Sequence, residues 1–278
     1  MSECNMNIRY KCRLSTDVLA KAAEELNEPE DNVKRLAAID LLRRTFESSS
    51  EGLQLYRSDD AFLLRFLRAR KFDQERSLAL LKNYHKQRVD WKDLFCKVNQ
   101  PILLKDILEA GCVHGIPKAG RNGSSLIIGL PGKVKNMLLI DFVALLFVSI
   151  EKLLEDEEMQ IHGLTVIHDM AYVDFRFATQ MGPRVAKRFL GLMQECLPVR
   201  IKSINMINEP RIFDVVFSVV QPFLKEKTKQ RLRVLGKDFP KLLDVIDPIN
   251  LPLTYGGSAP ELDPSAWKSR IIGEEESV

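Results

Sequence analysis

The stretch Ile204–Arg233, INMINEPRIFDVVFSVVQPFLKEKTKQRLR, joins a strand-like run, an apolar helix and a basic cluster. The strand-like run breaks at Asn208-Glu209-Pro210. Pro210 suits the first turn of a helix, because its missing N–H would have no partner there in any case. A second proline, Pro222, should end or kink that helix. The stretch therefore predicts a strand, a turn and a helix in immediate succession.

The predicted helix has more apolar surface than packing on a core requires. From Ile212 to Leu224 its only polar side chains are Asp214, Ser218 and Gln221, which share one narrow strip. The apolar remainder covers an arc of roughly 200°, whereas a surface helix docks with a stripe of about 100°. Either this helix is buried on all sides, or it covers a second apolar surface such as a cavity, a groove or a membrane.

Positive charge follows the helix directly. Five cations oppose the single acid Glu226, which gives a net charge of +4: Lys225, Lys227, Lys229, Arg231 and Arg233. Lys227 and Arg231 are four residues apart and would share a face if the chain is helical there. An apolar surface beside a basic cluster suits a lid that opens on a membrane.

The composition indicates a globular protein without membrane spans. Of 278 residues 45% are hydrophobic and 28% charged, and the net charge of +3 is too small to indicate nucleic acid. The N-terminus lacks the apolar core of a signal peptide, and the uncharged apolar run Phe142–Ile150 is far shorter than the about 20 residues of a bilayer span. We expect a cytoplasmic monomer with peripheral membrane contact. The cysteines are scattered and form no CxxC pair, which indicates reduced thiols: Cys4, Cys12, Cys96, Cys112 and Cys196.

Residues 14–95 are typical of an all-helical unit, preceded by a flexible N-terminus at residues 1–13. Ser15-Thr16 can cap a first helix, a second helix fits Val33–Phe46, and Ser58 can cap a third. The third helix has an apolar face and a basic edge that is typical of a solvated surface: Arg65, Arg68, Arg70 and Lys71.

Residues 100–257 alternate between strand-like runs and helices. The strand-like runs cover residues 124–130, 161–168, 199–207 and 231–235, and the helices cover residues 101–109, 137–154, 183–196 and 238–246. This alternation predicts an α/β fold with a mostly parallel sheet, followed by a C-terminal tail at residues 258–278.

The helix at 137–154 also has surplus apolar surface. Asp141 is its only charge before Glu151. The helix is therefore either entirely core or has one face on core and one on a cavity. Together with the helix at 212–224, it favours an internal apolar chamber.

Catalytic motifs are missing from the sequence. It contains no GxSxG, GxGxxG or GxxxxGK[ST] pattern. His162 and His168 would fall on the same face of the strand at 161–168, but a structural or exposed role fits them better than a shared site. The acidic run Asp156–Glu158 splays around a helix and makes no acid–base pair. We expect no enzyme activity, no metal and no cofactor.

Four blocks carry a family resemblance: DDAFLLRFLRARKFD (59–73), INEPRIF (207–213), QPFLKEKTKQR (221–231) and LPLTYGG (251–257). Occurring together and in order, they make the chain resemble the CRAL-TRIO lipid-transfer family from about Leu14 to Trp267, most closely the tocopherol transfer proteins and their paralogues. The resemblance implies a small helical N-terminal domain and an α/β lipid-binding domain. In that domain an apolar chamber lies over the sheet and is closed by a mobile helical gate.

Motif alignment carries three sets of residues over to this chain. The gate falls on 211–224, with Arg211, Ile212, Phe213, Val216, Phe217, Val220, Phe223 and Leu224. The implied chamber lining is Val143, Leu146, Ile150, Leu164, Val166, Phe189, Leu192, Met193, Phe213 and Phe217. The implied phosphoinositide-binding residues are Arg70, Arg200, Lys202, Lys227 and Arg231.

Departures from the family pattern bear on the ligand. Glu195-Cys196-Leu197-Pro198 replaces the usual Asp-Ser-Phe-Pro, and Leu146 and Ile150 stand where two serines line the tocopherol chamber. Loss of those serines makes the chamber drier and argues against α-tocopherol itself.

The sequence therefore predicts a non-enzymatic carrier of one hydrophobic lipid, such as a tocopherol-like molecule, a retinoid or another isoprenoid. The lipid is the cargo. The carrier would exchange it at phosphoinositide-containing membranes through the gate, and it would bind no nucleic acid. The alternative is a membrane-recruited interaction module that recognises phosphoinositides and holds lipid only as a structural filler.

Overall fold

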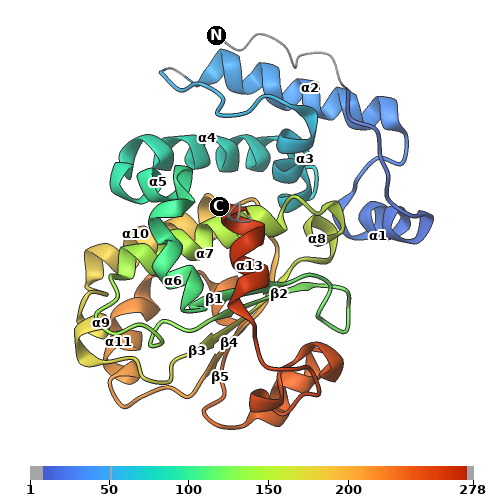
Figure 1. The fold of residues 1–278 in the computed structure, drawn as a ribbon. Helices are drawn as coiled ribbons and strands as arrows, with labels where there is room; N and C mark the ends of the chain where they lie inside the picture. Colours follow the sequence, from blue (N-terminus) through green and yellow to red (C-terminus); the bar gives the residue numbers. More distant parts are fainter. Residues whose placement is uncertain (1–8, 51, 274–278) are drawn as a thin grey trace, which may run out of the picture. The chain divides into compact units, whose positions relative to one another are not determined.

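The computed structural model describes residues 9–50 and 52–273. The chain divides into two compact units (Figure 1). Unit 1 holds the chain up to Asp90 together with Glu195–Arg200, and unit 2 holds Trp91–Gln194 and the chain from Ile201 onward. The first eight residues of the predicted flexible N-terminus lie outside the described residues.

Unit 1 is helical. Its helices are α1 (Thr16–Leu26), α2 (Asn32–Ser49), α3 (Asp60–Ala69) and α4 (Gln74–Asp90). Ser15 caps α1 by accepting a hydrogen bond from the Val18 N–H, as predicted. Asp59 rather than Ser58 caps α3, with its Oδ1 2.9 Å from the Phe62 nitrogen. A carboxylate is favoured at this position because it also faces the positive end of the helix dipole.

The basic edge of α3 was predicted to be solvated, and the burial of Arg68 contradicts that prediction. Its side chain is fully buried and donates to both carboxylate oxygens of Glu28, at 2.8 and 2.9 Å. Arg35 on α2 donates to the same carboxylate at 2.8 Å. Arg65 is also buried, with its guanidinium 4.5 Å from the centroid of the Phe62 ring. Local pattern could not predict this burial, because the partner of Arg68 lies 40 residues away in the sequence.

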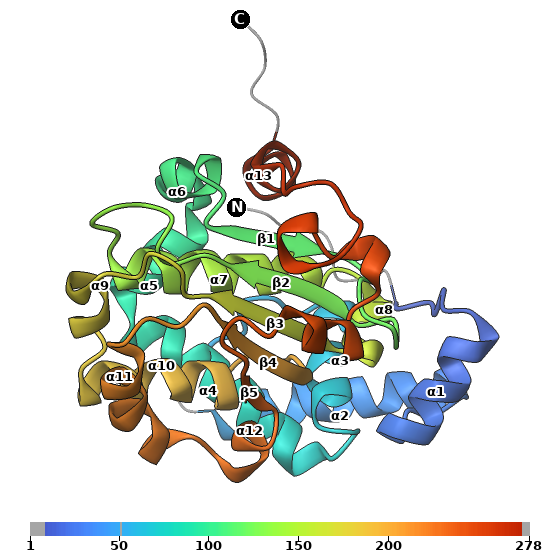
Figure 2. The same cartoon turned by 90° about the horizontal axis from the view of Figure 1, so that it is seen from below.

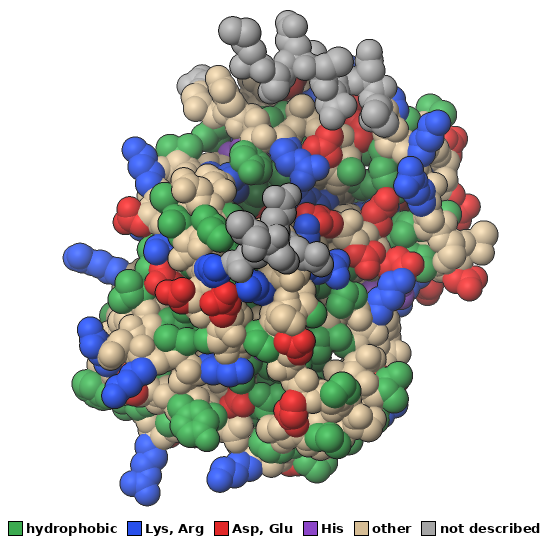
Figure 3. Space-filling model, viewed as in Figure 1, with side chains coloured by type: hydrophobic (Ala, Val, Ile, Leu, Met, Phe, Trp, Pro, Cys, Tyr) green, Lys and Arg blue, Asp and Glu red, His purple; other side chains and the backbone are tan. Residues whose placement is uncertain are grey.

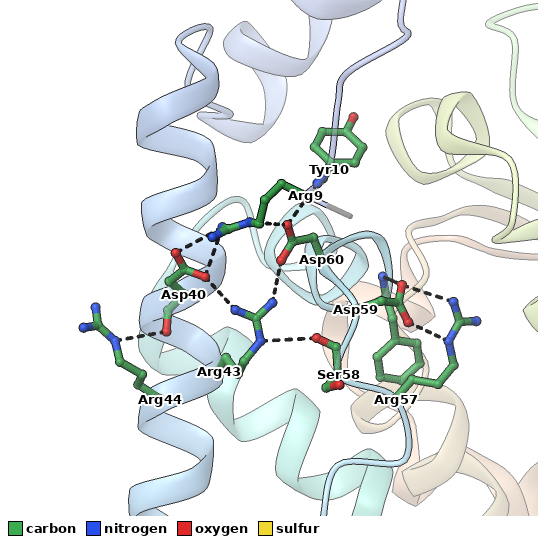
Figure 4. Close-up of polar contacts among 10 residues, drawn as sticks. Arg9, Tyr10, Asp40, Arg43, Arg44, Arg57, Ser58, Asp59 and Asp60 are labelled. Atoms are coloured by element: carbon green, nitrogen blue, oxygen red, sulfur yellow. Dashed lines mark hydrogen bonds and ion pairs between the residues drawn. The ribbon is translucent and has the colours of Figure 1, made fainter. Parts of the chain in front are cut away.

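A second network of ion pairs ties the segment before α1 to two helices of unit 1 (Figure 4). Asp60 accepts hydrogen bonds from Arg9 Nε at 2.9 Å, from the Tyr10 N–H at 3.0 Å and from Arg43 at 2.5 Å. Asp40 accepts from Arg9 and Arg43 as well. Burial raises the pKa of Asp60, but these hydrogen bonds outweigh burial and hold the pKa below its usual value. Arg9 and Tyr10 thus contact α2 and α3, and the flexibility predicted for residues 1–13 stays a prediction.

Unit 2 is an α/β domain. Its strands are β1 (Val113–Ile116), β2 (Ser125–Gly129), β3 (Leu164–Asp169), β4 (Ile201–Ile207) and β5 (Leu232–Val234). Its α-helices are α5 (Lys92–Asn99), α6 (Lys105–Glu109), α7 (Leu139–Leu153), α8 (Glu157–His162), α9 (Phe175–Thr179), α10 (Pro183–Glu195), α11 (Phe213–Val220), α12 (Glu226–Lys229) and α13 (Pro264–Ile272). Its 3-10 helices are η1 (Pro101–Leu104), η2 (Gln221–Phe223), η3 (Phe239–Asp244), η4 (Pro248–Asn250) and η5 (Leu253–Tyr255).

The strands of the described chain form one sheet in the order β1-β2-β3-β4-β5 (Figure 2). β1 pairs antiparallel with β2, and the other neighbouring pairs are parallel. Helices link the parallel strands, as the βαβ connection requires. The structure confirms the predicted mostly parallel α/β sheet. The predicted helix at 238–246 is instead the shorter 3-10 helix η3.

The two faces of the sheet pack differently. One face packs on the segment 239–255 in a buried cluster that includes Ile128, Ile167, Ile207, Leu242, Ile246 and Tyr255. The strand register places Ile127, Val166 and Ile204 side by side on the opposite face. We call this opposite face the α7 face, since α7 lies on that side of the sheet (Figure 1).

The C-terminal part of the described chain is packed rather than free. Trp267 on α13 is buried, and its Nε1 donates to Ser149 Oγ on α7 at 3.1 Å. Its ring lies over Gly115 on β1, where an added Cβ would be 2.3 Å from the ring. The segment predicted as a tail therefore includes a helix that covers part of α7 and β1.

Candidate functional site

The α7 face is incompletely covered at β4. Ile204 and Met206, on this face, stay half-buried, whereas Ser203, Asn205 and Ile207 on the other face are buried. β4 has hydrogen-bonded neighbours on both sides, so this exposure does not come from a sheet edge. Strands of parallel sheets are normally covered on both faces. The apolar side chains of β4 on the α7 face therefore keep accessible surface.

The predicted chamber-lining residues come from four elements of unit 2. They are Val143, Leu146 and Ile150 on α7, Leu164 and Val166 on β3, Phe189, Leu192 and Met193 on α10, and Phe213 and Phe217 on α11. Phe189, Met193 and Phe217 are half-buried, and the others are buried. The helices α10 and α11 thus share with β4 a set of apolar side chains that keep accessible surface. Their contact with a ligand stays a prediction.

The predicted gate is centred on α11. Phe213 is the only buried residue of α11, and it stacks on Phe217 with ring centroids 5.5 Å apart. Val215 is 60% exposed. A helix of sequence FDVVFSVV with this exposure is not buried on all sides, so that interpretation of the stretch is wrong. Pro222 ends the α-helix as predicted, and the chain continues as the 3-10 helix η2.

The other gate residues differ in exposure. Arg211 is exposed, Leu224 is buried, and the half-buried ones are Ile212, Val216, Val220 and Phe223. α11 lies against α9 (Figure 2).

Gln194 holds the C-terminal end of the gate to α10. Its Nε2 donates to the Phe223 carbonyl at 3.1 Å. Its Oε1 accepts from the Lys225 N–H at 2.9 Å and from Thr228 Oγ1 at 2.8 Å. One side-chain amide thereby bonds three points of the segment after α11. The sequence shows no signal for this role, because Gln194 is an ordinary polar residue near a helix end.

Exposed apolar and basic side chains lie together near the gate. Tyr172 is 89% exposed, Phe175 69% and Leu138 52%. The basic side chains Lys135 and Arg176 on neighbouring segments are exposed too. The space-filling view shows hydrophobic and basic side chains interspersed over α9 and α11 (Figure 3). Such a mixture suits contact with an anionic, apolar surface.

The predicted phosphoinositide-binding residues divide between the units. In unit 2, Lys202 is the second residue of β4, and the Arg231 carbonyl accepts the Ile204 N–H at 2.8 Å just before β5. Lys227 lies on α12, which ends at Lys229, so the helix on which Lys227 and Arg231 would have shared a face does not extend to Arg231. Lys202, Lys227 and Arg231 therefore lie near the amino ends of two adjacent strands.

Arg70 and Arg200 belong to unit 1. Arg200 forms an ion pair with Glu25 at 2.8 Å. Burial lowers the pKa of the Arg70 guanidinium, and the positive charge of Arg76 lowers it further. The role of all five cations in binding a phosphoinositide stays a prediction.

The histidines His162 and His168 do not share a strand face. α8 runs to His162 and Gly163 follows it with a φ of 90°, so β3 begins only at Leu164. His162 Nδ1 is 2.7 Å from the Asn122 carbonyl oxygen. His168 lies near the carboxyl end of β3, on the α7 face, in register with Gly129 and Met206.

Asp169, the next residue of β3, serves the opposite face of the sheet. It accepts hydrogen bonds from the Tyr255 hydroxyl and from Asn208 Nδ2, each at 2.9 Å. Burial and the nearby Asp169 carboxylate raise the pKa of Tyr255 far above its usual value. Asp169 is therefore a structural residue of the core.

Ile204, Met206 and His168 were not predicted from the sequence as site residues. Strand alternation counted from Val166, together with the register of β3 and β4, would have placed these three residues on the same face of the sheet as Val166.

Comparison with known proteins identifies the architecture. The CRAL/TRIO domain family matches residues 110–257, and the CRAL/TRIO N-terminal domain family matches residues 18–83. The chain belongs to the CRAL/TRIO family. Alpha-tocopherol transfer protein-like from Homo sapiens is 37% identical over 271 residues, which cover 96% of this chain and 78% of that protein. Clavesin-2 from Mus musculus is 30% identical and covers 94% of this chain and 80% of that protein.

A solved structure supports the fold assignment. The structure of Sfh5 superposes with a TM-score of 0.54 at 17% identity, and the match covers 92% of both chains. Within the described residues, no helix is long and apolar enough to cross a bilayer. The described residues also contain no cluster of His, Cys, Asp and Glu suited to hold a metal ion.

Proposed function

We propose that this CRAL/TRIO chain is a non-enzymatic carrier that binds one hydrophobic lipid in unit 2 and exchanges it at membranes. The observation that carries the proposal is the pairing of an incompletely covered α7 face with α11, an apolar helix of which only Phe213 is buried. A helix with this composition is stable at a water-exposed position only if another apolar surface offsets the cost of exposure. A lipid ligand on one side and a bilayer on the other provide such surfaces.

The energetics of transfer favour a gated carrier. Moving a lipid out of water is favourable by about 0.8 kcal/mol per methylene, and a bilayer offers the same gain as an apolar chamber. The equilibrium between chamber and membrane is then nearly balanced, and the rate of opening decides how fast lipid moves. The closed gate prevents loss to water, and docking of its apolar face on a membrane opens it.

Basic side chains would direct this exchange to anionic membranes. Lys202, Lys227 and Arg231 of unit 2 lie in the same part of the sheet, near the chain that follows the gate. Each cation near an anionic surface contributes about 1 kcal/mol. Phosphoinositide binding would promote release only if the lipid headgroup binds the open gate more tightly than the closed one. In this proposal the protein acts at the cytoplasmic side of membranes and has a lipid cargo rather than a cofactor.

The test is lipid transfer between donor and acceptor liposomes by wild type, Val215→Asp and Ile249→Asp. Val215 is 60% exposed on the gate, and Ile249 is 69% exposed on η4, so the two substitutions are matched in chemistry and exposure. We expect Val215→Asp to keep its bound lipid but to transfer it about tenfold more slowly, and Ile249→Asp to match wild type.

Equal transfer by all three proteins would remove the gate assignment. Absence of transfer by wild type, with binding to phosphoinositide liposomes intact, would instead favour the interaction module.

A further inference from the structure

His168 is the one histidine for which no hydrogen-bond partner is found within residues 9–50 and 52–273. His85 Nε2 accepts the Tyr56 N–H at 2.8 Å, and its Nδ1 contacts the Leu81 carbonyl. His114 contacts the Gly111 carbonyl at 3.0 Å, and His162 contacts a backbone carbonyl as well. Polar groups in folded proteins are nearly always hydrogen-bonded, and the His168 side chain is half-buried, so its ring nitrogens can still take a partner from outside the protein.

The ring of His168 lies among apolar groups of unit 2. Phe142 on α7 has its ring centroid 6.1 Å away, and the Phe142 ring in turn lies 6.2 Å from that of Phe177 on α9. Gly129 on β2 leaves room for the imidazole, since a Cβ added there would be 3.0 Å from His168 Nδ1. Any side chain at position 129 would press on the imidazole ring, so the glycine makes room for His168 in this position.

The imidazole is neutral at physiological pH. Burial lowers its pKa to about 4, because the surrounding protein replaces the water that would solvate the charged form. A neutral imidazole offers one N–H donor and one nitrogen acceptor. Yet the side chain is half-buried rather than sealed, so part of it faces a space that another molecule can enter.

That space belongs to the proposed lipid site. Val166 and Leu164 are on the same face of β3 as His168, two and four residues earlier, and Met206 is its register partner on β4. Ligands of open α/β sheets commonly bind beyond the carboxyl ends of the strands, and His168 is the penultimate residue of β3. α9, which carries Phe177, lies against the gate helix α11. His168 is thus a polar group on an otherwise apolar wall near the gate.

We propose that His168 hydrogen-bonds the polar end of the carried lipid, and that the carrier therefore selects a lipid alcohol over a hydrocarbon of the same shape. This inference rests on the proposed function. A hydroxyl fits best because it can accept a hydrogen bond from the imidazole N–H or, in another arrangement, donate a hydrogen bond to the other ring nitrogen. A hydrocarbon would leave both nitrogens unsatisfied in an apolar site, which disfavours its binding. Strand alternation places His168 on the α7 face, but the sequence gives no sign that its ring has no partner within the protein.

The experiment is a competition between two probes of matched skeleton: all-trans-retinol and the hydrocarbon in which a methyl group replaces its CH2OH group. Wild type, His168→Phe and His168→Gln are loaded from liposomes that hold both probes in equal amounts, and the bound lipids are counted by mass spectrometry. We expect wild type to retain the alcohol over the hydrocarbon by about tenfold, the order of magnitude of one hydrogen bond in a buried site. His168→Phe should lower the ratio to near one with total loading unchanged. His168→Gln, which keeps a donor and an acceptor, should retain most of the preference.

A second measurement uses wild type alone and does not depend on the folding of a variant. The 15N chemical shifts of the His168 ring should change on loading with the alcohol and stay unchanged on loading with the hydrocarbon. Equal ratios for wild type and His168→Phe, or equal 15N shifts for both probes, would overturn the role of His168 while the carrier function stands. Failure of wild type to load either probe or any lipid of the donor membrane would overturn the proposed function itself, and the role of His168 with it.

Discussion

Gln194 offers the most direct test of how the proposed gate is held shut. Its side chain makes three hydrogen bonds to the segment after α11, through Phe223, Lys225 and Thr228. Gln194→Ala removes all three. Each such bond contributes about 0.5–1.5 kcal/mol net, and water can replace part of it at a half-buried position. We estimate that the closed gate loses about 1–3 kcal/mol, which corresponds to about 5–150-fold in the ratio of open to closed gate.

Two measurements report this change. Hydrogen exchange of backbone amides in residues 221–229 should speed up by a factor in that range, because local opening becomes more frequent. Release of a bound fluorescent lipid to acceptor liposomes should accelerate as well. The control is Gln160→Ala, which removes a hydrogen bond of 2.9 Å to the Leu154 carbonyl between α7 and α8. That variant should leave both rates at the gate unchanged.

The reasoning about Gln194 would be refuted if the exchange of residues 221–229 and the release of lipid matched wild type in Gln194→Ala. Faster exchange without faster release would mean that this end of the gate does not control the exit of lipid. Both results are distinct from a general loss of stability, which would raise exchange throughout unit 2.

Three further predictions concern charge, pH and packing. Replacing Lys227 and Arg231 together by alanine should leave lipid occupancy intact and slow delivery to phosphoinositide liposomes by about tenfold, whereas delivery to neutral liposomes should not change. Burial lowers the pKa of His114 to about 4 from 6.5, so the unfolded chain binds a proton that the folded chain does not, and stability should fall by up to about 3 kcal/mol as pH drops through this window. Urea unfolding at pH 4.5 and at pH 7 should show that His114→Gln loses less unfolding free energy between the two pH values than wild type does. Gly115→Ala should destabilise the chain by about 1–3 kcal/mol, because the added methyl group would meet the Trp267 ring at 2.3 Å; a melting temperature equal to that of wild type would contradict this.

Periodicity along the chain was enough to predict the mostly parallel sheet and the position of α11. The alternation of short apolar runs with helices predicted β2, β4 and β5, because parallel strands are separated by helices. Pro210 and Pro222 lie on either side of α11, and the sequence alone predicts this because proline lacks the N–H that a helix interior requires. Family resemblance supplied the lining and phosphoinositide residues, and these roles stay predictions.

Features that depend on distant partners could not be predicted in this way. Arg68 has the local pattern of a solvated cation, and the approach of Glu28 from the segment between α1 and α2 makes its burial tolerable. His162 continues an apolar run and looks like part of a strand, but a glycine with positive φ at 163 separates α8 from β3. The anchoring by Gln194 and the open setting of His168 likewise arise from tertiary packing.

The position of Trp267 matters for anyone who shortens this chain. The match to the CRAL/TRIO domain stops at residue 257, which makes that residue an inviting end point for a recombinant fragment. Such a fragment would lack α13 and would uncover Gly115 on β1 and Ser149 on α7, which the indole covers in the intact chain. The surface uncovered at Gly115 and Ser149 would favour self-association, so aggregation of the fragment should not be mistaken for a defect of the lipid-binding domain.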